Sequence, residues 1–287
     1  MIIPKSVFVA SALVVLAAAC SGTGETTAVD AAPAAISATT TTTAVESVAS
    51  TEPVETTAAP FTRLIELVAE PPAWEDVTFE TTDGVELYAK FWPGGDTAVL
   101  FGHDYSVTTA GSNGQRPPQS SDSILIYSGT VAREGYTVLS PDFRGHGQSG
   151  GEFHPQSGPE DLKAAYDFLI DRDYTKIVMV GWVGSGTTAV VLDASDEGVT
   201  FDGITMLFSP PQDHGLNADV VLSDLEAPIF FVGSNAGTSA SWSRRMSAKA
   251  LNSQGAFVFD RTPTGLQFND VFGPEFVGRI LEFVDGV

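Results

Sequence analysis

Residues 176–189 read Lys-Ile-Val-Met-Val-Gly-Trp-Val-Gly-Ser-Gly-Thr-Thr-Ala, and this stretch decides the fold. Its first half, 176–182, is an apolar run of the kind that forms a buried strand. A glycine-rich turn follows, and residues 184–195 then have the composition of a helix. The stretch therefore predicts a strand, a sharp turn and a helix, with Val183 at the turn.

The segments on either side extend this pattern. Residues 74–80 and 85–92 flank a Thr-Thr-Asp-Gly turn and predict an N-terminal β-hairpin. The other expected strands are 97–103, 136–143, 203–209, 228–233 and 256–260, and the other expected helices are 121–134, 159–172, 239–251 and 272–284. Alternating strands and helices predict an α/β domain over 61–287, with a mostly parallel eight-stranded sheet and helices on both faces. In such a sheet a ligand site lies beyond the carboxyl ends of the strands.

The N-terminal segment predicts export and lipid attachment. The apolar run 7–19 is too short to span a bilayer, which takes about 20 helical residues, and it fits the core of a signal peptide. Cys20 follows directly, in a sequence that resembles a bacterial lipoprotein cleavage box, and it is the only cysteine. We expect residues 1–19 to be a lipoprotein signal peptide and lipidated Cys20 to anchor the protein to the cell membrane, on its extracytoplasmic side. An ordinary secretory signal with an incidental cysteine is the alternative.

Residues 20–60 predict a disordered tether between this anchor and the domain. From 21 to 60 the chain is dominated by Thr, Ala, Ser, Pro and Glu and contains no aromatic residue, Lys or Arg. Such a stretch buries too little apolar surface to offset the entropy of ordering. Either O-linked glycosylation or a plain spacer fits this composition. The net charge of −22 excludes nucleic acid as a partner, because phosphate binding needs clustered Lys and Arg.

Three motifs give the domain a resemblance to a known superfamily. Residues 138–151, Val-Leu-Ser-Pro-Asp-Phe-Arg-Gly-His-Gly-Gln-Ser-Gly-Gly, resemble the loop after the fourth strand of α/β-hydrolases. Residues 98–103 resemble the strand that ends in their oxyanion loop, and 227–234 the strand that delivers their catalytic acid. In order and spacing, the segments over 75–285 are similar to secreted lipoproteins of actinobacterial type, which resemble esterases, lipases and serine-aminopeptidase-like hydrolases.

The resemblance implies a Ser-His-acid triad, yet all three positions are substituted. In the Gly-x-Ser-x-Gly elbow of the family, the central position corresponds to Val183, which has no nucleophilic atom. The histidine position corresponds to Thr264, whose hydroxyl cannot accept a proton near neutral pH. The acid position corresponds to Asn235, in the carboxylate-free loop 234–240. We therefore expect the fold without a conventional triad.

Valine also conflicts with the backbone of such an elbow. The family holds the central residue at positive φ, which β-branched side chains resist. We therefore expect a relaxed or shifted turn, in which Gly184 instead of Val183 takes the unusual conformation.

Ser185, His103 and His146 are the candidates for a replacement chemistry. Each also has a structural interpretation: Ser185 bonds to the helix start, His103 anchors its loop, and His146 supports the Arg-Gly-x-Gly turn. His103 and Asp104 are possible metal ligands, but their spacing matches no standard metal motif. We expect neither a metal nor a cofactor.

Several side chains are expected at the carboxyl edge of the sheet, either lining a ligand pocket or filling the space of an unused site. They are His103, Asp104, Tyr105, Phe143, Trp182 and Gly184. Three functions remain open. The first is a pseudo-hydrolase that binds a small molecule or a protein at the degenerate site. The others are a serine-type hydrolase with a non-standard site, and a structural envelope protein without a pocket.

Overall fold

The computed structural model describes residues 64–105, 120–235, 237–259 and 273–287. The expected signal peptide, Cys20 and the tether lie outside these residues, as does Thr264. In the described part, no helix is long and apolar enough to cross a membrane.

The predicted strands and helices are all present, most of them within about three residues of the expected bounds. The main strands are β1 (Glu75–Glu80), β2 (Glu86–Trp92), β3 (Thr97–Gly102), β4 (Thr137–Pro141), β5 (Lys176–Trp182), β6 (Gly203–Leu207), β9 (Ile229–Ser234) and β10 (Ser253–Phe259). The α-helices are α1 (Leu125–Arg133), α2 (Gly158–Ile170), α3 (Gly184–Asp193), α4 (Ser239–Lys249) and α5 (Gly273–Gly286). Short 3-10 helices cover Ser121–Ile124, Pro155–Ser157 and Ala218–Val220.

The eight main strands form one sheet in the order β1-β2-β4-β3-β5-β6-β9-β10. The N-terminal hairpin β1-β2 is antiparallel, and β2 pairs antiparallel with β4. All other neighbours are parallel. The mostly parallel eight-stranded sheet is therefore confirmed. Because β3, β4 and β5 are neighbours and parallel, their carboxyl ends lie at one edge of the sheet.

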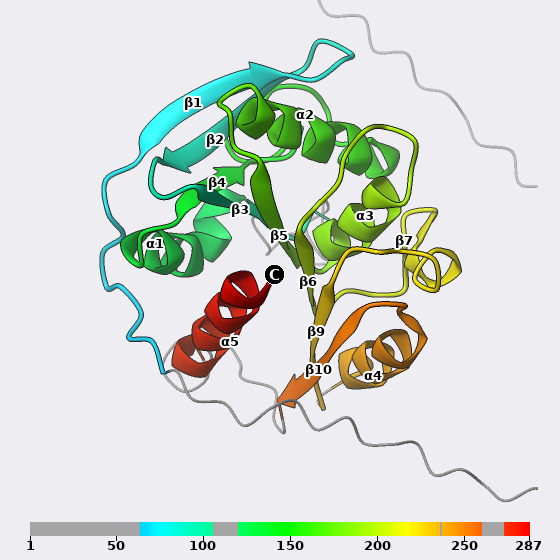
Figure 1. Ribbon diagram of the computed structural model, residues 1–287. Coiled ribbons are helices and arrows are strands. Elements are labelled where there is room, and N and C mark those ends of the chain that lie inside the picture. The colour runs from blue at the N-terminus through cyan, green and yellow to red at the C-terminus, as the bar shows by residue number, and fades with distance from the viewer. Residues whose placement is uncertain (1–63, 106–119, 236, 260–272) are drawn as a thin grey trace, which may run out of the picture. The chain divides into compact units, whose positions relative to one another are not determined.

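Helices cover both faces of the sheet, as predicted. Helices α1 and α5 lie on one face, and α2, α3 and α4 lie on the other (Figure 1). Each face has its own apolar core, and strands such as β4 and β6 are buried along their whole length. Burial on both faces explains why these strands read as continuous apolar runs instead of alternating patterns.

Helix α2 illustrates how the sequence sets these elements. It opens with Pro159 in its first turn, where a missing N–H costs nothing, followed by Glu160 and Asp161, whose charges suit a helix N-terminus. The buried side chains of Leu162 and Leu169 face the sheet. This amphipathic pattern is what predicted the helix.

A second, two-stranded sheet was not predicted. It consists of β7 (Gln212–Asp213) and β8 (Leu216–Asn217), joined by His214 and Gly215. Both loop residues have positive φ, 46° and 88°, as a two-residue type I′ hairpin requires. The dipeptide His-Gly after an aspartate is a turn signal. Strands of two residues, however, are too short to show the alternation of apolar and polar residues that predicts a strand. The hairpin packs on α3.

A half-buried carboxylate at the end of α3 makes the stability of the domain depend on pH. Burial raises the pKa of Asp193 to about 6, and Asp202 adds to the rise against a hydrogen bond from the Phe201 N–H. Because the folded pKa exceeds the unfolded one, this group favours folding below about pH 4, and that stability is lost as pH rises through 6. Asp193→Asn should flatten the decline in melting temperature between pH 4 and pH 7. The exposed Asp196→Asn serves as control and should keep the wild-type slope.

Candidate functional site

The turn between β5 and α3 keeps the shape of a nucleophile elbow, with valine at its centre. Val183 has φ 52° and ψ −111° and immediately precedes α3. Its N–H donates to Leu207 O at 2.8 Å, and its carbonyl accepts from the Gly186 N–H at 3.2 Å. Our expectation of a relaxed turn with Gly184 in the unusual conformation is therefore wrong. Val183 itself takes the positive φ.

Close packing of helix against strand explains why valine does not relax the turn. A Cβ added to Gly181 would lie 2.4 Å from Gly186 Cα, and one added to Gly186 would lie 2.2 Å from Ser209 Oγ. Helix α3 thus starts directly against β5, and only a very sharp turn connects them. The contact between the two glycines outweighs the local preference of Val183, whose cost is of order 1–3 kcal/mol.

We expect Val183→Gly to raise the free energy of unfolding by about 1 kcal/mol. Glycine removes the positive-φ strain, and part of that gain is offset by about 0.5–1 kcal/mol of extra entropy in the unfolded chain. The melting temperature should rise by about 2–4 °C. Val183→Ala is the matched control, because it removes the same methyl groups but keeps Cβ. If the alanine variant is as stable as the glycine variant, backbone strain at Val183 is not the cause.

The side chain of Ser185 points toward the carboxyl ends of β3 and β5. Its side chain is fully buried, and its single O–H is shared between Gly102 O at 2.8 Å and Trp182 O at 3.0 Å. In the described part of the chain, no hydrogen bond joins Ser185 to a histidine. Counting from Gly181, Ser185 stands where the motif has its last glycine. The observed role is to tie the start of α3 to the ends of β3 and β5.

His103 ties the end of β3 to the loop after β4. It is fully buried, Nε2 accepts the Phe143 N–H at 3.0 Å, and Nδ1 lies 3.2 Å from Asp104 O. Nδ1 therefore carries the hydrogen and donates to this carbonyl. Burial, with a smaller contribution from nearby His146, lowers the pKa of His103 to about 3. Both ring nitrogens are used by the backbone, so the imidazole stays neutral and offers no lone pair to a substrate.

His146 supports the loop after β4. Its side chain is buried, Nδ1 donates to Arg144 O at 2.9 Å, and Nε2 has no hydrogen-bond partner among the described residues. In the same loop Asp142 accepts the N–H groups of Ser121 (2.7 Å) and Gln148 (2.8 Å). Asp142 and Arg144 thus brace the loop through separate partners instead of pairing with each other.

Three of the candidate pocket residues pack together on the face that carries α2 and α3. The Phe143 ring lies 4.9 Å from that of His103 and 5.0 Å from that of Tyr105. The Tyr105 hydroxyl bonds to Thr188 of α3 and lies 3.5 Å from the carbonyl oxygen of Gly184, a buried residue. These side chains fill space with one another, whereas neighbouring Asp104 is half-buried.

Trp182 belongs to a different aromatic group, on the opposite face of the sheet. Its ring stacks on Tyr127 of α1 at 5.4 Å and lies 5.6 Å from Phe276 of α5 and 5.8 Å from Phe208. The structure therefore separates Trp182 from Tyr105 and Phe143, with the sheet edge between them. That a ligand occupies either group stays a prediction.

Asn235 lies where the resemblance puts the acid. It directly follows β9, is exposed, and its N–H donates to Phe259 O at 2.9 Å. In this described loop the position carries an amide instead of a carboxylate. Substitution of all three triad positions stays a prediction, because the segment that contains Thr264 is not described.

Sequence reasoning missed one carboxylate–histidine pair near this edge. His214 Nε2 is buried and lies 3.9 Å from Asp213 Oδ1, too far for a hydrogen bond. The imidazole stacks on Tyr105 at 6.4 Å. Burial raises the pKa of Asp213, nearby His214 lowers it, and Asp104 raises it further. In the described residues, no three His, Cys, Asp or Glu side chains are grouped to hold a metal ion.

Known proteins resemble the chain in structure alone. No protein-family model matches it, and no curated protein matches its sequence. Solved structures do match. An esterase from Pyrococcus furiosus is 19% identical with a TM-score of 0.60, over 74% of this chain and 90% of that one. The protein DcsB, solved with its substrate analogue, is 12% identical with a TM-score of 0.61, over 75% and 99% of the two chains.

An α/β hydrolase from Penicillium sp. sh18 is 13% identical with a TM-score of 0.59, over 74% of this chain and 98% of that one. At these identities the likeness establishes the architecture and carries no activity with it. The domain therefore has the α/β-hydrolase fold, which confirms the resemblance at the level of the fold.

Proposed function

We propose that this protein, an α/β-hydrolase fold with valine at its elbow, is a lipid-anchored protein of the cell envelope. In this proposal it binds a small molecule or a protein at the degenerate site instead of cleaving a substrate. The observation that carries the proposal is the geometry of Val183. The elbow keeps the backbone that presents a nucleophile, while the side chain it presents has no nucleophilic atom.

The surroundings of the elbow support this proposal. Covalent catalysis needs a hydroxyl within about 2.6–3.2 Å of a base. The single O–H of Ser185 is shared between two backbone carbonyls, and both ring nitrogens of His103 bond to backbone groups of Phe143 and Asp104. For Ser185 to act, this buried three-centred hydrogen bond would have to break, at a cost of about 0.5–1.5 kcal/mol. The serine-type hydrolase with a non-standard site is therefore the less favoured function.

Labelling with a fluorophosphonate tests the proposal directly. The full chain, its Ser185→Ala variant and a known serine esterase are treated together, and turnover of short p-nitrophenyl esters is followed in parallel. We expect no labelled serine in the chain, and equal, background turnover in the wild type and in Ser185→Ala. A labelled serine, or turnover that Ser185→Ala abolishes, would establish the hydrolase instead.

The lipid anchor has its own test. Cys20→Ser should move the protein from the membrane fraction to the soluble fraction and should abolish incorporation of a labelled fatty acid. Because Cys20 is the only cysteine, no other thiol can take its place. Membrane association that survives Cys20→Ser would refute lipidation while leaving the proposal for the elbow untouched.

A further inference from the structure

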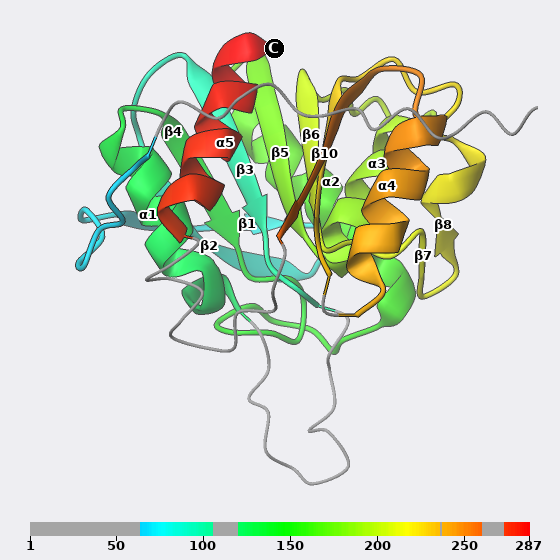
Figure 2. The same cartoon turned by 90° about the horizontal axis from the view of Figure 1, so that it is seen from below.

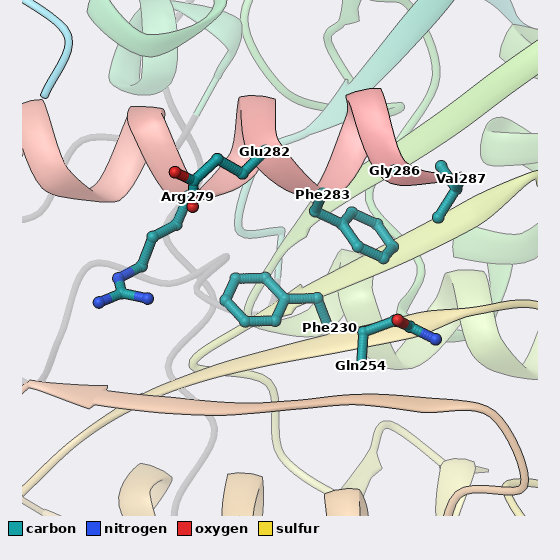
Figure 3. A pocket seen from close by; sticks show the side chains of 7 residues that line it. All are labelled: Phe230, Gln254, Arg279, Glu282, Phe283, Gly286 and Val287. Atoms are coloured by element: carbon teal, nitrogen blue, oxygen red, sulfur yellow. The ribbon is translucent and has the colours of Figure 1, made fainter. Parts of the chain in front are cut away.

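A pocket lies at the amino edge of the sheet, away from Val183. It has a volume of about 210 Å³, and its walls come from the starts of β9 and β10 and from the last turns of α5 (Figure 3). Seven residues line it: Phe230, Gln254, Arg279, Glu282, Phe283, Gly286 and Val287. Nothing in the proposed function uses this pocket.

Two aromatic rings form the apolar wall. Phe230 and Phe283 are 6% and 8% exposed, and their rings stack with centroids 5.9 Å apart and an angle of 27° (Figure 3). Phe283 also packs against the backbone of β6, since a Cβ added to Gly203 would lie 2.8 Å from its Cζ. The aromatic wall is therefore fixed in place before any ligand arrives.

The polar rim favours a ligand that donates hydrogen bonds. Arg279 is held on Glu275 by two hydrogen bonds of 3.0 and 2.8 Å, and its guanidinium lies 3.8 Å from the centre of the Phe257 ring. Arg279 and Glu282 are the charged side chains of the lining, and the guanidinium of Arg279 is already engaged by Glu275. A carboxylate accepts several hydrogen bonds at once, so Glu282 can take a ligand donor in addition to its present contacts.

The volume of the pocket limits the size of the ligand. A dry cavity of about 150 Å³ accommodates benzene, whereas drug-sized ligands fill about 300–1,000 Å³. A pocket of about 210 Å³ therefore takes one aromatic ring with a short substituent. We propose that this pocket is a binding site for a single-ring aromatic amine, whose ring packs on Phe230 and Phe283 and whose ammonium group donates to Glu282.

Benzylamine is the probe, and benzoate, which has the same ring with an anionic acceptor, is the matched control ligand. Binding to the full chain is followed by titration calorimetry and by ligand-observed NMR. We expect saturable binding of benzylamine with Kd of order 1 mM, and binding of benzoate at least tenfold weaker. Equal affinities for the two probes, or no saturation by benzylamine at 20 times the expected Kd (on the order of 20 mM), would overturn the proposal.

Two variants locate the site. At Gly286 an added Cβ meets nothing within 4 Å, so Gly286→Leu can fill the pocket without a clash. It should abolish benzylamine binding. Glu282→Gln should weaken it about tenfold, whereas the exposed Glu226→Gln, which removes the same charge elsewhere, should leave it unchanged. Unchanged binding in both Gly286→Leu and Glu282→Gln would place the ligand somewhere else and end the proposal.

Discussion

Replacing Arg144 with methionine is expected to lower the free energy of unfolding by about 3–5 kcal/mol, the cost of leaving a buried charge without its partner. Arg144 is 6% exposed and links three elements. Its Nε donates to Asp161 Oδ1 at 2.7 Å, Nη1 and Nη2 donate to Asp83 at 2.6 and 3.0 Å, and Nη2 lies 3.3 Å from Glu160 Oε2. Methionine fills similar volume but pairs with none of these carboxylates.

The loss of stability caused by Arg144→Met should depend on pH. Burial raises the pKa of Asp161 to about 6, while its hydrogen bonds and ion pair with Arg144 oppose the rise. Arg144→Met keeps the backbone hydrogen bond to Asp161 but removes the guanidinium, so burial and nearby Asp83 should hold the Asp161 proton to still higher pH. A folded pKa above the unfolded one favours folding at low pH, and this stability is lost as pH rises. The destabilisation by Arg144→Met should therefore be larger at pH 8 than at pH 5, as measured by urea unfolding.

Arg245→Met is the matched control for this variant. Arg245 pairs with a single aspartate, with Nη2 2.8 Å from Asp219 Oδ2, and its side chain is 56% exposed. Pairs of this kind contribute about 0–1 kcal/mol. If Arg144→Met is as mild as Arg245→Met, the network around Arg144 does not hold the three elements together.

The order of elements could be predicted because the signals are local. The β-branched run of β5 and the amphipathic pattern of α2 each specify one element without reference to the rest of the chain. The partners of Arg144 could not be predicted, since Asp83 is 61 residues away and reaches it only when the N-terminal hairpin packs beside the loop after β4. Contacts of this range follow from topology rather than from any local pattern.

The sequence predicts the place of the elbow but not its backbone conformation. Its position in the sequence, at Val183, was predictable from the strand, the glycines and the helix. Its backbone was not, because the preference of valine favoured a relaxed turn and the close packing of α3 on β5 at Gly181 and Gly186 prevailed. The split of the aromatic residues has a similar cause. Trp182 ends β5 and Tyr105 follows the end of β3 at the same edge, yet they pack against helices on opposite faces.

Gly181→Ala tests whether that contact imposes the elbow. Its Cβ would lie 2.4 Å from Gly186 Cα and 2.5 Å from Gly186 N, and backbone atoms cannot move aside as a flexible side chain can. Overpacking of this kind costs about 1–3 kcal/mol, and we expect the upper end, with a melting temperature about 6–12 °C lower. Gly286→Ala is the control, because its Cβ meets nothing within 4 Å.

The double variant Gly181→Ala/Val183→Gly separates clash from strain. If the contact between β5 and α3 forces Val183 to positive φ, an alanine that pushes the two apart also lets the turn relax. The gain of about 1 kcal/mol expected from Val183→Gly should then shrink in the Gly181→Ala background, a coupling that a double-mutant cycle measures. Strictly additive effects would mean that Val183 keeps its conformation for a reason other than this contact. The same cycle therefore tests whether the packing of α3 against β5 keeps Val183 at positive φ.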